Sequence, residues 1–267
     1  MDNLAAFIAL ACLILPVIGE MWVRQRGRQS AICSHPVWAV LATTALLVSV
    51  VQIAVQSGSW PMVTVRGGLQ TLALVVSGGW LILRTRERME AAGVILLALV
   101  GWLTAASLVE SPGAVAQSSV SPFFSMHLGL IFLGLGAFAL SFALSALFLL
   151  QRRRLKNKNL SGIQELPALD TLDRLNFRTQ GFGFVALTVG IAMGFFLAME
   201  TGSGRGLNGL TFWGTVSVWC WYAIGLQTRL MGGWRGKPAA VFGVVGFGGL
   251  SLILGLAALW AGGWHGV

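Results

Sequence analysis

The chain alternates long apolar stretches with short polar connections along its whole length. Each stretch is close to the roughly 17 to 25 apolar residues that a helix needs to cross a bilayer. The stretches cover residues 3–22, 36–56, 61–83, 91–109, 126–150, 180–199, 211–229 and 238–262. This pattern predicts an all-α protein, a polytopic transmembrane helical bundle of about eight helices that forms a single integral membrane domain over residues 1–267.

The composition supports a membrane location. Of the 267 residues, 56% are hydrophobic and 10% are charged, whereas an ordinary soluble domain has roughly 25% charged residues. So few charges cannot cover a water-facing surface, and we expect the helices to contact membrane lipid. The first stretch has no basic residue before it, so we expect it to remain in the mature protein rather than to be removed as a signal peptide.

The basic residues are distributed unevenly over the connections. All but two of the 18 Lys and Arg residues follow odd-numbered stretches, and the exceptions are Arg66 and Arg205. Because Lys and Arg in short loops are retained on the cytoplasmic side, both termini are predicted to face outward, together with these two arginines. The net charge of +9 then reflects cytoplasmic loops beside anionic lipid. A nucleic-acid partner is not expected.

One predicted connection, over residues 151–179, is longer than the others. Its first half is basic and follows the fifth stretch as a stop-transfer flank. Its second half places acidic residues ahead of Leu172, Leu175 and Phe177, which predicts a short interfacial helix. Two roles remain open for this cytoplasmic loop: an anchor and spacer, or a docking site for a partner protein.

Small residues recur at every fourth position in two of the apolar stretches. The two series are Ala186, Gly190 and Gly194, and Ala137, Ser141 and Ser145. Small side chains at this spacing share one face of a helix and let a neighbouring helix approach closely. We therefore expect both series to serve helix packing.

The cysteines and the ionisable residues exclude several kinds of chemistry. Cys12, Cys33 and Cys220 are far apart in the sequence, with no CxxC pair, and no CxxCH sequence is present that could attach haem covalently to this chain. The middle of the predicted spans contains almost no ionisable residue, which argues against a proton relay or an ion-coupled carrier. Any chemistry is expected on the outward face.

Two of the three histidines fall at the outward ends of predicted spans. His127 begins the fifth, in SPFFSMHLGLIFLG, and His265 follows the eighth, in LWAGGWHGV. A neutral imidazole in such a position can ligate the iron of haem, with one axial nitrogen on each face of the macrocycle. Anchoring at the membrane interface is the alternative for each residue. His35 precedes Pro36 on the cytoplasmic side and is left out of the predicted site.

Four segments of the chain carry a family resemblance. They are SMHLGLIFLGLGAFALSFALSALFLLQRRRLKNKN, LDRLNFRTQGFGFVALTVGIAMG, YAIGLQTRLMGGWRGKPAAVFGVVGF and the terminal GWHG, with a weaker likeness at SGSWPMVTV. In this order they resemble the membrane cytochrome c assembly proteins, the haem-handling CcsA, CcmC and HemX type. The resemblance implies that His127 and His265 hold haem on the outward face of a bacterial inner (cytoplasmic) membrane. The implied partners are apocytochrome c or another cytochrome c assembly subunit.

One motif of that family is missing. In the family a tryptophan-rich WGxxWxWD loop lies between the two histidines, but residues 200–210 contain no tryptophan. Trp213, Trp219 and Trp221 come later, and the last two lie two positions apart, so they point to different faces of a helix. The short loop resembles the HemX-like and YpjD-like branch, and it argues against a synthetase that joins haem to another polypeptide.

The two outward arginines complete the predicted site. Arg66 and Arg205 can pair with haem propionates, and contact with lipid phosphate is the alternative for each. We therefore expect a protein that assists cytochrome c assembly by holding non-covalent, b-type haem through His127, His265, Arg66 and Arg205. Two other functions remain open. One is a structural or regulatory protein that binds a partner through the 151–179 loop, and the other is a small-molecule carrier, which a lack of buried polar groups disfavours.

Overall fold

The fold is a bundle of long helices. The computed structural model describes residues 4–25, 36–58, 60–87, 92–109, 121–158, 167–200 and 210–263. Within these ranges the helices are α1 (Leu4–Gln25), α2 (Pro36–Ser57), the short 3-10 helix η1 (Pro61–Val63), α3 (Val65–Glu87), α4 (Ala92–Val109), α5 (Pro122–Lys156), α6 (Leu169–Glu200), α7 (Leu210–Gly232) and α8 (Lys237–Gly263). The predicted all-α class and the eight predicted helices are confirmed, and the described residues contain no strand.

The helices have the length and the apolar surface of membrane spans. Among the described residues, four stretches are long and apolar enough to cross a membrane: Val37–Gln56, Arg66–Thr85, Pro122–Lys156 and Leu169–Glu200. Shorter apolar helical stretches lie within α1 and α4. Large apolar side chains are exposed along the outside of the bundle, as expected for a surface that faces lipid rather than water. The protein is therefore a multi-pass membrane protein.

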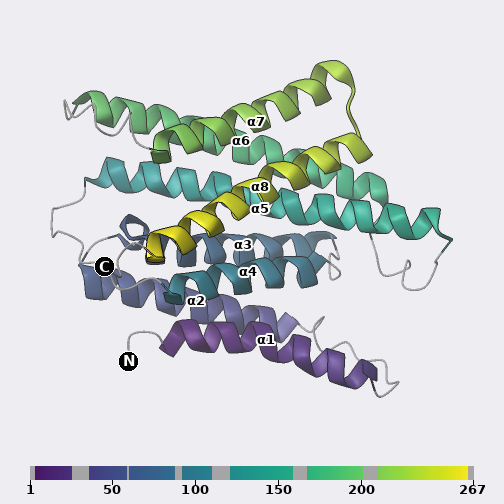
Figure 1. Ribbon diagram of the computed structural model, residues 1–267, viewed down its shortest axis with the longest axis horizontal. Helices are drawn as coiled ribbons and strands as arrows, with labels where there is room; N and C mark the ends of the chain where they lie inside the picture. Colours follow the sequence, from purple (N-terminus) through teal and green to yellow (C-terminus); the bar gives the residue numbers. More distant parts are fainter. Residues whose placement is uncertain are drawn as a thin grey trace.

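Successive helices form antiparallel pairs that stack across the bundle (Figure 1). The pair α1–α2 lies at one edge and α6–α7 at the other, and α5 lies between them in contact with α3, α4, α6 and α8. Phe138, Ala139 and Ala143 of α5 are fully buried. A helix that is apolar around its whole circumference belongs in such a central position.

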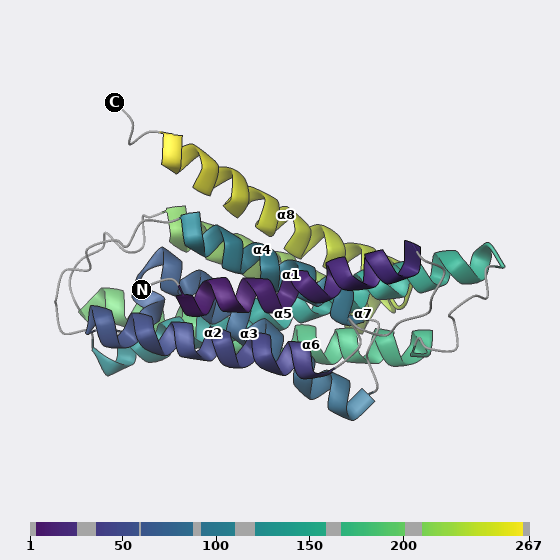
Figure 2. The same ribbon diagram turned by 90° about the horizontal axis from the view of Figure 1, so that it is seen from below.

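The first turn of α1 and the last turn of α8 lie at the same end of the bundle in both views (Figures 1 and 2). This is the arrangement that the even number of predicted spans requires. Which side of the membrane that end faces stays a prediction.

Two helices extend furthest beyond their predicted bounds. The fifth was predicted over residues 126–150, but α5 continues through the basic residues to Lys156, because cations stabilise the C-terminal end of a helix. The sixth was predicted to begin at residue 180, but α6 begins at Leu169. The predicted interfacial helix is thus the first part of α6, and buried Leu172 and Leu175 belong to its packed face. The connection between α5 and α6 is correspondingly shorter than 151–179.

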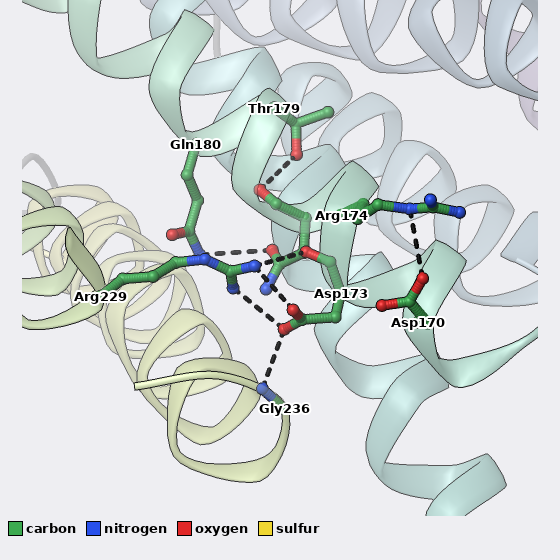
Figure 3. Close-up of polar contacts among 8 residues, drawn as sticks. Asp170, Asp173, Arg174, Thr179, Gln180, Arg229 and Gly236 are labelled. Atoms are coloured by element: carbon green, nitrogen blue, oxygen red, sulfur yellow. Dashed lines mark hydrogen bonds and ion pairs between the residues drawn. The ribbon is translucent and has the colours of Figure 1, made fainter. Parts of the chain in front are cut away.

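A buried ion pair joins α6 to the turn between α7 and α8 (Figure 3). Arg229 donates from Nη1 to Asp173 Oδ1 at 2.9 Å and from Nη2 to Oδ2 at 2.6 Å. The Gly236 amide also donates to Asp173 Oδ1, at 2.9 Å. The two side chains are only 9% and 12% exposed. One carboxylate thereby connects α6, the last turn of α7 and the turn at residues 233–236 that leads into α8.

Gly233 and Gly236 of this turn have positive φ values of 64° and 69°. Glycine adopts that conformation without the steric cost that other residues meet. The turn can therefore bring the Gly236 amide to the Asp173 carboxylate.

We expect Asp173→Asn to destabilise the protein by about 3 to 5 kcal/mol, because removing one partner leaves a buried guanidinium without its counter-charge. The matched control is Asp170→Asn, which lies on the same helix and pairs with Arg174 at 3.4 Å with side chains 79% and 63% exposed. Such an exposed pair contributes roughly 0 to 1 kcal/mol. Thermal unfolding of both purified variants in detergent checks the difference. Equal losses of stability in the two variants would refute the stabilising role of the buried Asp173–Arg229 pair.

Candidate functional site

The site lies in the interface between α5 and α6, where the two helices pack closely. A Cβ atom added at Gly183 would lie 3.0 Å from Ala137 Cβ, and one added at Gly134 would lie 3.0 Å from the Gly183 carbonyl oxygen. Ala186 and Gly190 are buried in the same interface. The series predicted from the small residues is therefore used for close packing, and it brings the α6 backbone within reach of side chains on α5.

His127 of α5 packs directly against the backbone of α6. Its ring is half-buried against α6, with Nδ1 2.7 Å from the carbonyl oxygen of Gly190. A Cβ added at Gly194 would lie 2.5 Å from His127 Cε1, so that only glycine leaves room for the ring. On the other side, the Phe124 ring lies with its centroid 6.1 Å from that of His127. The imidazole is therefore held in one orientation by its neighbours.

The contact with Gly190 determines the tautomer of the imidazole. A carbonyl oxygen can only accept a hydrogen bond, so Nδ1 carries the hydrogen and donates it. In the neutral ring Nε2 then has a lone pair available. Metal-ligating histidines are commonly oriented in this way, with one ring nitrogen donating to a backbone carbonyl and the other directed to the metal. The donor chemistry of His127 therefore fits an axial ligand of haem iron.

The surroundings of His127 are apolar and open. Phe123 is 65% exposed, Phe124 38% and Met126 56%, all in the first turns of α5. Trp60, which precedes η1, is 54% exposed at the same end of the bundle, where η1 contacts α5. A flat, mainly apolar ligand is accommodated by such side chains more easily than a polar one.

Arg66 lies near this end but is not exposed. Thr64 accepts the Gly67 amide on its Oγ1 at 3.0 Å and thereby caps the start of α3. Arg66 follows in the first turn and is only 8% exposed. Gly68 lies against Phe132 of α5, which follows His127 by little more than one turn, so Arg66 and His127 belong to the same end of the α3–α5 pair.

His265 and Arg205 lie outside the described residues, so the structure does not place them. The helix that precedes His265, α8, packs on α5 and α7 through its first half, and Figure 2 shows its C-terminal half diverging from the bundle. Within the described ranges no group of three or more His, Cys, Asp or Glu residues is arranged to hold a metal ion. Shared ligation by His127 and His265 stays a prediction.

Two tryptophans of α7, Trp219 and Trp221, pack against neighbouring helices on different faces, as their spacing predicts. Trp213 is 59% exposed. Trp219 faces α6, where its indole donates to Thr188 Oγ1 at 2.8 Å and stacks on Phe184. Trp221 faces α8 and stacks on Phe242 with ring centroids 4.3 Å apart. They lie on different faces of α7, and do not form one stacking platform.

Buried polar clusters are the feature that the sequence analysis missed. Between α5 and α6, Ser141 donates to Asn176 Oδ1 at 2.6 Å, and Gln180 donates to Ser141 Oγ at 3.0 Å. A second cluster joins α2, α3 and α4 through Ser49, Gln70 and Ser107. The prediction disfavoured a carrier because it expected few buried polar groups, and that premise is wrong. The four-residue spacing of Asn176 and Gln180 within an otherwise apolar face was the available signal.

Comparison with known proteins identifies the family. A family model described as Cytochrome C assembly protein matches residues 2–265. Two relatives named cytochrome c biogenesis protein CcsA come from different strains of Prochlorococcus marinus. That of strain NATL1A is 38% identical over 95 residues, which is 34% of this chain and 30% of the relative. The other is 31% identical over 171 residues, which is 53% of this chain and 54% of the relative.

A relative of the same name from Chlamydomonas reinhardtii is 32% identical over 128 residues, covering 48% of this chain and 35% of the relative. The chain thus matches between about a third and a half of the length of these relatives. No solved structure matches it. Because the family model spans almost the whole sequence, the chain belongs to the cytochrome C assembly protein family.

Proposed function

We propose that the protein handles haem during cytochrome c assembly, and that His127 is a ligand of the haem iron. The observation that carries the proposal is the 2.7 Å hydrogen bond between His127 Nδ1 and the Gly190 carbonyl. It leaves Nε2 as the free lone pair on a half-buried ring at one end of the bundle.

The remaining ligands follow from the sequence. His265 would supply a second imidazole nitrogen to the iron, and Arg66 and Arg205 would pair with the propionates of a non-covalently held, b-type haem. When bound, haem supplies its iron and its vinyl groups to the assembly of a cytochrome. The chain itself orients the imidazole of His127 through Gly190, while Phe123, Phe124 and Met126 provide an apolar surface at the same place.

The location and partners are part of the same proposal. The protein spans a bacterial inner membrane with both termini on the outward, periplasmic side, as the distribution of basic residues indicates. Its partners are apocytochrome c or another cytochrome c assembly subunit. We place it in the HemX-like and YpjD-like branch of the family because residues 200–210 lack tryptophan, although the relatives reported above carry the name CcsA. Attachment of haem to a cytochrome by this chain alone is not proposed.

A second candidate function is that of a structural or regulatory membrane protein that binds a partner at the 151–179 region. The observation that favours it is the extension of α5 beyond the apolar span. The exposed basic residues there are Arg152, Arg153, Arg154, Lys156 and Lys158. In that case the purified protein contains no haem.

We expect the protein purified in detergent from haem-replete cells to show the Soret band of a b-type haem. The His127→Ala and His265→Ala double variant is expected to lose this band, because both axial nitrogens are removed. The His35→Ala variant is the control, since His35 is not part of the proposed site. A colourless wild-type protein would exclude the haem proposal and favour the second candidate.

We also expect Gly194→Ala to lower the haem content without unfolding the protein. The added methyl group would lie 2.5 Å from His127 Cε1 and so displace the ring, at an overpacking cost of about 1 to 3 kcal/mol. Gly181→Ala is the matched control on the same helix, because a Cβ there has no atom within 4 Å. It should keep the haem and the stability of the wild type. If the Gly194→Ala protein kept an unchanged Soret band, the packing of His127 against Gly194 would not be needed for haem binding.

A further inference from the structure

A groove lies between α7 and α8 at the end of the bundle opposite to His127. It has a volume of about 530 Å³, and its lining includes Trp221, Trp234, Lys237, Val241, Phe242 and Val245. Val241 is 40% exposed and Val245 52% exposed, so the groove opens to the outside of the bundle. The proposed haem site does not use any of these residues.

The polarity of the groove changes along the helix. Lys237, Val241 and Val245 are spaced four residues apart on α8 and therefore lie on one face of it. Lys237 is in the first turn of α8, and Val245 lies about 12 Å further along the helix at 1.5 Å per residue. The groove is thus cationic at the start of α8 and apolar further along the helix.

The charge around the open end is positive. Arg235 and Lys237 are exposed there, and the N-terminal end of α8 adds a partial positive charge. Phe148 of α5 lies against Gly236, at 3.4 Å from a Cβ added there, which places the basic end of α5 at the same end of the bundle. Among the described residues, the carboxylate at this turn is that of Asp173, and it is already engaged by Arg229 and the Gly236 amide.

We propose that this groove binds one anionic phospholipid. The phosphate of the headgroup lies at Lys237, and one acyl chain follows Val241 and Val245 beside the stacked rings of Trp221 and Phe242. Charge complementarity favours an anionic over a zwitterionic headgroup, since basic pockets between spans on the cytoplasmic side attract anionic lipid. The apolar length of the groove favours a lipid over free phosphate, which has no group to place against Val241 and Val245.

The experiment is native mass spectrometry of the full-length protein, titrated with phosphatidylglycerol, with phosphatidylcholine and with inorganic phosphate. We expect one phosphatidylglycerol to bind more tightly than phosphatidylcholine, and inorganic phosphate not to displace it. Lys237→Gln keeps the apolar stem and removes one charge, so it should weaken phosphatidylglycerol binding about fivefold. Val245→Trp fills the apolar part and should weaken binding of the same lipid.

The control is Arg154→Gln, an exposed basic residue at the same end of the bundle but outside the groove. It should leave the affinity for phosphatidylglycerol unchanged. Equal binding of both lipids, or an equal loss in Lys237→Gln and Arg154→Gln, would overturn the proposal of a specific anionic site. Displacement of the lipid by inorganic phosphate, or unchanged binding in Val245→Trp, would overturn the placement of the acyl chain. The outcome is independent of whether the protein binds haem.

Discussion

Where α5 and α6 meet, their backbones come so close that Gly134, Gly183 and Gly190 could not carry a larger side chain without displacing a neighbour. In a membrane the solvent is as apolar as the helix surfaces, so association depends on close contact and on hydrogen bonds between helices. The α5–α6 interface has both, because Ser141, Asn176 and Gln180 form a hydrogen-bonded cluster beside the small residues. α3, α4 and α8 also pack on α5, and the orientation of His127 depends on the α5–α6 interface.

The same helix, α6, makes polar contacts at two distant points along its length. In its first turns Asp173 binds Arg229 and the Gly236 amide, which fixes the turn between α7 and α8. Further along α6 the Gly190 carbonyl accepts the imidazole N–H of His127. A helix held by two polar contacts so far apart has little freedom to slide against α5. The backbone carbonyl that orients the imidazole is therefore kept at a constant position.

The sequence predicted the elements better than it predicted their contacts. The long apolar stretches and the distribution of basic residues indicated eight spans. Small residues at every fourth position indicated the α5–α6 interface. The start of α6 was misplaced because the polar residues of its first turns resemble a loop in a hydropathy pattern, although Leu172 and Leu175 are buried. His127 was identified as a candidate ligand, but its partner was not, since a backbone carbonyl on another helix has no signature in the sequence. The buried cluster of Ser49, Gln70 and Ser107 was missed because single polar residues in apolar spans pair only after folding.

The central claim is that Nε2 of His127 ligates haem iron while Nδ1 is held by Gly190. The most direct test is the absorption spectrum of the His127→Gly variant, purified with and without added imidazole. The account predicts that the Soret band of the wild type is lost in the variant and returns when free imidazole occupies the space left by the side chain. A His127→Gly protein that keeps the wild-type spectrum without imidazole would contradict the account.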